Sequence, residues 1–191
     1  PKPSSAASDV YKRQDYNING GVGLISSRLS VEGPIQKEKS SFIVSGRRTY
    51  ADLFLKTSND YKDNKLYFYD LNLKANYQLN ENNRLYLSGY FGRDVLGLGN
   101  TFSTDWGNTT ATLRWNSIIN SKLFSNTSFI YSNYDYKVSL KSNDNNFGLN
   151  SKIQDWNLKQ DFTWFAGNKH SVRFGLQSIY HTITPSSASG T

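Results

Sequence analysis

The segment LYFYDLNLKANYQL, from Leu66 to Leu79, alternates apolar and polar side chains along its whole length. One set of alternate positions carries Tyr67, Tyr69, Leu71, Leu73, Ala75, Tyr77 and Leu79, and the other carries Asp70, Asn72, Lys74, Asn76 and Gln78. A period of two residues is that of a β-strand with one apolar face and one polar face. Soluble strands usually have about 5–6 residues, whereas about 9–11 residues cross a bilayer at a tilt. The segment therefore predicts a strand long enough to cross a membrane.

The same alternation recurs elsewhere and predicts about eight strands in the chain. It is clear in residues 25–32, 84–92, 105–116, 154–165 and 170–183, and it is short in residues 41–48. Aromatic side chains occupy both faces of residues 123–138, so the sequence leaves the register of that strand open. A slip of one residue would exchange the two faces of a strand, so the register of the clear segments is well specified.

The connections between these segments alternate in length. The short ones are residues 33–39, 80–83, 118–121 and 166–169, and the long ones are residues 49–65, 93–104 and 141–150. This sorting predicts an all-β fold, an antiparallel up-and-down transmembrane β-barrel fragment with its short turns at one rim. Thr49 and Asp52 have the spacing of a helix capping box, which predicts a helical turn in the first long connection.

Composition excludes several classes of protein. The 191 residues contain no Cys, which excludes disulfides, thiolate metal sites and a cysteine nucleophile. There is no apolar run of about 18 residues, as a transmembrane helix requires. The chain has no Met, so we expect it to be an internal piece of a longer protein, with residues 1–14 a non-native leader and residues 185–191 a truncated loop. Its net charge is +7, but the basic residues are dispersed, which disfavours a nucleic-acid-binding barrel.

Alternation alone fits either a soluble barrel with its apolar face inward or a membrane barrel with its apolar face toward lipid. The long strands and the sorted loops favour the membrane barrel. Aromatic residues near the predicted strand ends also favour it, since such residues form girdles at membrane interfaces: Tyr67, Trp106, Trp115, Trp156, Trp164 and Tyr180.

Four stretches resemble the first barrel strands of TonB-dependent outer-membrane receptors. They are GGVGLISSRLSVEGPI (Gly20–Ile35), taken as a single opening strand, SFIVSGRRTY (Ser41–Tyr50), LYFYDLN (Leu66–Asn72) and LSGYFGRD (Leu87–Asp94). The resemblance covers residues 16–184 and is closest to the branch whose members carry a carboxypeptidase-regulatory-like module before the plug domain. It implies about the first third of a barrel of about 22 strands.

The resemblance also implies a location, partners and an activity. The location is the cell outer membrane, and the partners are outer-membrane lipid, the plug domain and remaining barrel of the parent chain, and the TonB complex. The activity is energy-coupled uptake of a scarce ligand such as a siderophore, cobalamin, a glycan or a peptide. The alternative is a small eight-stranded outer-membrane barrel with an adhesive or structural role.

Charged residues on the polar faces are the candidates for function, as groups that face the lumen or the plug: Arg28, Glu32, Arg47, Asp70, Lys74, Asp155, Lys159 and Asp161. They either pair with one another across strands or make specific contacts with the plug, such as that of an arginine with a plug carboxylate. Arg47 and Arg48 point to opposite faces if both lie in a strand. His170 and His181 also fall on opposite faces, which disfavours a shared metal. No catalytic constellation is recognisable, so we expect neither an enzyme nor a cofactor.

Overall fold

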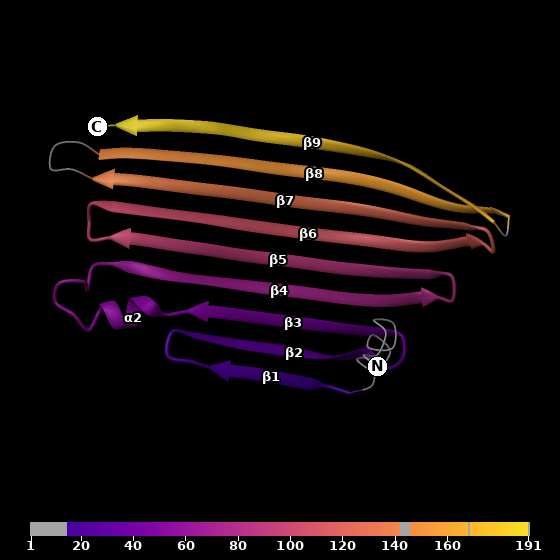
Figure 1. The fold of residues 1–191 in the computed structure, drawn as a ribbon, viewed down its shortest axis with the longest axis horizontal. Helices are drawn as coiled ribbons and strands as arrows, with labels where there is room; N and C mark the ends of the chain where they lie inside the picture. Colours follow the sequence, from indigo (N-terminus) through magenta and orange to yellow (C-terminus); the bar gives the residue numbers. More distant parts are fainter. Residues whose placement is uncertain (1–14, 142–145, 168, 191) are drawn as a thin grey trace.

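The computed structural model describes residues 15–141, 146–167 and 169–190, which form one antiparallel sheet of nine strands in sequence order (Figure 1). Its elements are β1 (Asn17–Val22), β2 (Ser26–Gln36), β3 (Ser40–Thr49), α2 (Ala51–Leu55), β4 (Lys65–Asn80), β5 (Asn83–Leu98), β6 (Phe102–Asn120), β7 (Leu123–Lys141), β8 (Asn146–Gly167) and β9 (His170–Gly190). The predicted all-β, antiparallel, up-and-down architecture of a barrel fragment is therefore confirmed.

The first predicted strand is two strands, which raises the count from about eight to nine. The stretch Gly20–Ile35 turns back on itself between β1 and β2, so that Gly21 stands opposite Arg28. The N–H of Gly23 donates to the carbonyl of Ser26 at 2.8 Å, and the hydroxyl of Tyr50 donates to the carbonyl of Gly23. These bonds close a tight turn that the alternation pattern could not reveal.

Four short turns lie at one rim, as predicted, but the opposite rim differs from the prediction. The expected loop of residues 93–104 is mostly strand, because β5 continues to Leu98 and β6 begins at Phe102. The chain reverses there through Gly99, whose φ of +55° favours glycine. Part of the expected loop 141–150 is strand as well, since β8 begins at Asn146. In the described chain only residues 50–64 form a long connection.

The predicted helical turn after Thr49 is present as α2, but the predicted capping box is not. Tyr50 is the residue before the helix and makes no side-chain cap. The Thr49 hydroxyl instead accepts the N–H of Phe68 at 2.8 Å, which joins β3 to β4. No helix within the described ranges is long and apolar enough to cross a membrane.

The structure describes most of the predicted C-terminal loop but none of the predicted leader. Residues 185–190, expected to belong to a truncated loop, continue β9 as far as Gly190. The expected leader, residues 1–14, lies outside the described residues.

The register across the sheet defines two faces. We call the outer face the one that carries a row of apolar residues across β4 to β8: Ala75, Leu87, Leu113, Phe129 and Leu158. The inner face carries the alternate residues, among them Asp70, Lys74, Arg114 and Lys159. The same register assigns the undecided strand 123–138, with Phe129 and Tyr131 on the outer face. It also puts Trp106 on the inner face, opposite Asp94 and Tyr136, so the prediction that this residue joins an outer aromatic girdle is wrong.

The sheet is a single layer without a hydrophobic core. None of the Ala, Val, Ile, Leu, Phe, Trp or Tyr side chains in the described ranges is buried. Large apolar side chains stand exposed on the outer face, such as Leu158 at 48% and Phe174 at 53%. Burial of apolar surface is the main favourable term in folding, so this face requires an apolar environment from elsewhere.

Candidate functional site

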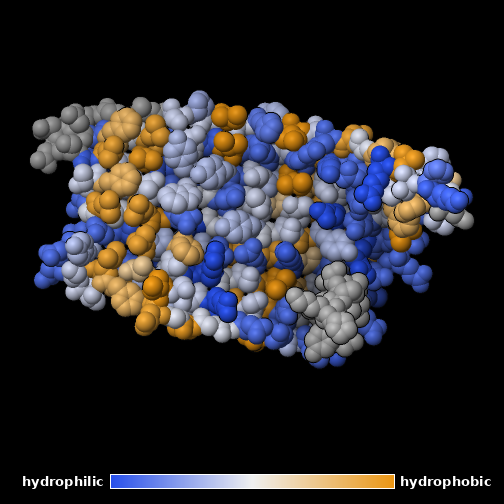
Figure 2. Space-filling model, viewed as in Figure 1, coloured by the Kyte–Doolittle hydropathy of each residue, from blue (hydrophilic) through white to orange (hydrophobic). Residues whose placement is uncertain are grey.

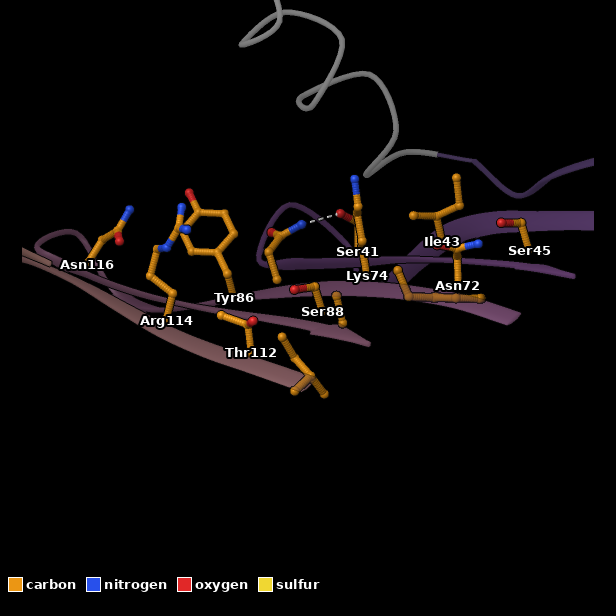
Figure 3. Close-up of a pocket in the computed structure, with 14 residues that line it drawn as sticks. Ser41, Ile43, Ser45, Asn72, Lys74, Tyr86, Ser88, Thr112, Arg114 and Asn116 are labelled. Atoms are coloured by element: carbon orange, nitrogen blue, oxygen red, sulfur yellow. Dashed lines mark hydrogen bonds between the residues drawn. The ribbon is translucent and has the colours of Figure 1, made fainter. Parts of the chain in front are cut away.

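A basic, polar groove lies on the inner face of β3 to β6. It has a volume of about 750 Å³, and its polar lining comes from alternate residues of successive strands. Figure 3 shows the labelled side chains rising from the strands toward the same side, with Tyr86 beside Arg114. The polar groups around it are Ser41, Ser45, Asn72, Lys74, Asn76, Tyr86, Ser88, Thr112, Arg114 and Asn116. No carboxylate is among the lining residues, so the groove is positively charged.

The two cations of the groove are available to a partner. Lys74 and Arg114 are exposed, and neither forms an ion pair with another described residue. Beside them, the Asn76 amide donates to the Ser41 hydroxyl at 2.6 Å, while the carbonyl oxygens of Asn76 and Asn116 are buried without a partner in the described chain. Cations next to amide and hydroxyl groups suit an oxygen-rich anionic group such as a carboxylate.

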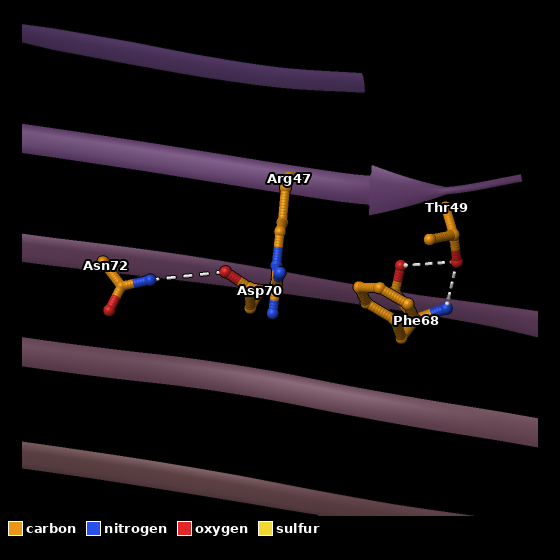
Figure 4. A network of polar contacts seen from close by, with 5 residues as sticks. All are labelled: Arg47, Thr49, Phe68, Asp70 and Asn72. Carbon is orange, nitrogen blue, oxygen red and sulfur yellow. Dashed lines mark hydrogen bonds and ion pairs between the residues drawn. The ribbon is translucent and has the colours of Figure 1, made fainter. Parts of the chain in front are cut away.

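A second polar cluster joins β3 to β4. Arg47 donates to the carboxylate of Asp70, which stands opposite it in the register. The Asn72 amide donates to the other oxygen of Asp70 at 3.3 Å (Figure 4). The Asp70 side chain is only 9% exposed, whereas Arg47 is 60% exposed and lies over the ring of Phe68 at 5.1 Å. Arg48 points to the opposite face and lies over Tyr67, so the predicted divergence of the two arginines is confirmed.

We expect Arg47→Ala to destabilise the fold by about 1–3 kcal/mol, because it leaves a nearly buried carboxylate with one amide partner. The double variant Arg47→Ala/Asp70→Ala should recover part of that loss, since it also removes the carboxylate that Arg47→Ala leaves without its ion-pair partner. Urea unfolding in detergent or lipid measures both effects. Lys74→Ala, four residues from Asp70 on the same face, is the control and should change stability little. A double variant that is less stable than Arg47→Ala would contradict the explanation.

The predicted site residues fall into two groups that the sheet keeps apart. Arg28, Glu32, Arg47, Asp70 and Lys74 lie on β2 to β4, with Arg28 directly opposite Arg47. Asp155, Lys159 and Asp161 lie on β8, four strands from β4 in the sheet order.

The β8 group makes contacts of its own. Asp155 lies 2.7 Å from Nδ1 of His181 on β9, and the Lys159 ammonium lies 3.1 Å from Asp161 on the same strand. His181 is on the inner face and His170 on the outer face, as predicted. Among the described residues no group of three or more His, Cys, Asp or Glu side chains could hold a metal.

Two cations of the inner face were not singled out from the sequence. Arg114 alternates with Leu113 and Trp115, so the pattern that identified Lys74 could have identified it too. Arg84 is the second residue of β5, directly after a turn, and donates to Gln78 at 2.9 Å. The proximity of Lys74 and Arg114 depends on the register of three strands, which the sequence does not give.

The fold and its polar inner face define an open, up-and-down β-wall of the kind that builds large barrels. Among solved structures, the chain is similar to BauA, the ferric preacinetobactin receptor from Acinetobacter baumannii. The TM-score is 0.64 at 12% sequence identity, and the match covers 92% of this chain and 31% of that receptor. The chain thus spans about a third of the length of the protein it matches. No family model matches the sequence, and no curated protein matches it.

Proposed function

We propose that the chain is part of the barrel wall of a TonB-dependent outer-membrane receptor, which takes up a scarce ligand in an energy-coupled way. The observation that carries the proposal is the single-layer sheet, whose outer face is apolar and has no core to cover it. Hydrocarbon is the environment that would cover such a face on long antiparallel strands. The likeness in fold to a ferric preacinetobactin receptor supports this class of protein.

The proposed partners follow from the surfaces of the sheet. Outer-membrane lipid would cover the outer face, and the remaining barrel would pair with the free edges of β1 and β9. The basic groove at Lys74 and Arg114 would face the lumen and receive a carboxylate of the plug domain. The TonB complex would act through a region N-terminal to this barrel wall. The chain would itself catalyse no reaction, and the ligand could be a siderophore, cobalamin, a glycan or a peptide.

The reading frame that surrounds the coding sequence tests this proposal. We expect it to continue upstream into a plug domain and downstream into more than a dozen further strands. Stop codons directly outside both ends would overturn the proposal. A small closed barrel gains no support from the described sheet, in which β1 pairs with β2 and β9 pairs with β8 at opposite ends of the strand order.

A further inference from the structure

A small polar pocket opens on the outer face of β7 to β9, toward the ends of the strands away from the short turns. It has a volume of about 320 Å³. Its lining residues on the outer face are Asn133, Asp135, Lys137, Asn150, Lys152 and Thr184. Figure 2, which views the inner face, shows orange apolar side chains gathered at the left end, over the same strand ends. The pocket is thus separate from the basic groove on the inner face of β3 to β6.

The two lysines of the pocket lack the carboxylate partners that the register places opposite them. Lys137 stands opposite Asp105 of β6, and Lys152 of β8 stands opposite Asp135. Arg93 of β5 contacts both carboxylates instead, at 2.5 Å from Asp105 and 3.5 Å from Asp135. Lys137 and Lys152 are exposed, and neither forms an ion pair within the part of the chain that the structure describes. Both cations therefore remain available to a partner from outside the chain.

The donors of the pocket suit a phosphate group. Lys137 stands opposite Asn150, two residues from Lys152, so the lysines are diagonal neighbours with about 7–8 Å between their backbones. Each ammonium is a point charge with three N–H donors, and the oxygens of one phosphate can accept from both. The amide of Asn150 and the hydroxyl of Thr184 add two further donors. The volume of the pocket reaches the range of small-molecule sites, from about 300 Å³, so it also has room for the group that carries the phosphate.

The surroundings of the pocket favour a lipid as the source of the phosphate. Trp156 lies on the outer face of β8, four residues from Lys152 toward the short turns, and Leu158 follows it on the same face. At about 3.3 Å per residue, Trp156 is about 13 Å along the strand from Lys152. The two apolar side chains are 41% and 48% exposed. An acyl chain below a phosphate at Lys152 would cover them, whereas a free phosphate would gain nothing from this surface.

We propose that the pocket binds the phosphate of an anionic lipid headgroup through Lys137 and Lys152, with the acyl chains of that lipid over Trp156 and Leu158. The outer face therefore selects an anionic lipid at this position from the lipid around it. This inference rests on the proposed function, since it requires the outer face to contact a bilayer.

Trp156 can report directly on the lipid beside the pocket. Replacement of the other three tryptophans, Trp106, Trp115 and Trp164, by Phe leaves Trp156 as the only one in the full chain. This protein is folded in phosphatidylcholine vesicles that contain a small fraction of phosphatidic acid with bromine atoms on its acyl chains. Quenching of Trp156 then measures how often the phosphate monoester lipid lies there. We expect an association at least about tenfold stronger than that of the same fraction of brominated phosphatidylcholine.

Charge-removing variants in the same single-tryptophan protein assign the preference to the pocket. Lys137→Gln and Lys152→Gln should each lower it about fivefold, the effect of one cation near an anionic lipid surface, and the double variant should abolish it. Lys65→Gln is the matched control, because Lys65 lies on the outer face at the same end of the sheet, on β4 and outside the pocket. This control should keep the full preference for phosphatidic acid.

The outcomes separate this inference from the proposed function. In vesicles made wholly of brominated phosphatidylcholine, absence of Trp156 quenching would overturn the proposed function and the lipid site with it. Strong quenching there, without a preference for phosphatidic acid or with equal losses in Lys65→Gln and Lys152→Gln, would overturn the lipid site alone. Release of phosphatidic acid by millimolar inorganic phosphate, but not by sodium chloride of equal ionic strength, would assign the pocket to free phosphate and overturn the lipid as its occupant.

Discussion

Leu113→Arg should lower the free energy of unfolding in a bilayer by about 2–4 kcal/mol. This is the cost of a lipid-facing cation near the bilayer midplane of a membrane barrel. Leu113 lies in the middle of the outer apolar band. Leu87 and Phe129 flank it on the neighbouring strands, and Ala111 and Trp115 flank it along β6. It is 47% exposed in the isolated sheet, so the new side chain fits without displacing packed neighbours. The expected loss therefore comes from the charge in hydrocarbon.

Thr110→Arg is the matched control for this prediction. It introduces the same side chain on the same strand, but on the inner face between Tyr90 and Ser132. We expect it to change stability by less than about 1 kcal/mol, as for other substitutions on a solvated surface. Urea titration of the protein folded in lipid vesicles, followed by tryptophan fluorescence, measures both variants. Equal losses for the two would contradict the assignment of the outer face to lipid.

Period-two alternation was enough to predict the class of fold, because a strand with one apolar face shows it directly in its sequence. The segment Leu66–Leu79 predicted β4 and the members of each of its faces. Where both faces carry aromatic residues, as in residues 123–138, the pattern could not decide which alternate residues form the outer face. The partners on β6 and β8 decide it in the structure, by placing Phe129 opposite Leu113 and Leu158.

The error at residues 93–104 has a physical cause. The predicted strands 84–92 and 105–116 leave residues 93–104 as a loop, but β5 and β6 continue through most of this segment. In the structure Arg93 stands opposite Gly107 and Asp105 opposite Val95, so the ladder continues, and the two charges pair diagonally across β5 and β6 at 2.5 Å. The alternation continues there, but the apolar residues Leu96 and Leu98 lie on the inner face and not on the outer face. The alternation pattern indicates the period of a strand, but it does not indicate which of the two faces meets water at a given position along the strand.

Gly175 of β9, which lies close to the backbone of β8, gives the second large effect. A Cβ at this position would overlap the carbonyl oxygen of Gln160 and lie 3.1 Å from Cα of Asp161. Both are backbone atoms, so relief requires β8 and β9 to separate. We expect Gly175→Ala to destabilise the sheet by about 1–3 kcal/mol, the usual cost of overpacking. β9 should become the first strand that a protease removes, because it has β8 as its only neighbour in the described sheet.

Gly167→Ala separates this effect from the general consequences of replacing glycine. A Cβ at Gly167, near the end of β8, meets no atom within 4 Å. This variant should be neutral or more stable by up to about 1 kcal/mol, because alanine reduces the freedom of the unfolded chain. The two substitutions are chemically identical and lie on adjacent strands, so opposite signs can only reflect the local backbone. Equal denaturant midpoints and equal proteolysis rates would mean that β8 and β9 are not held together at Gly175.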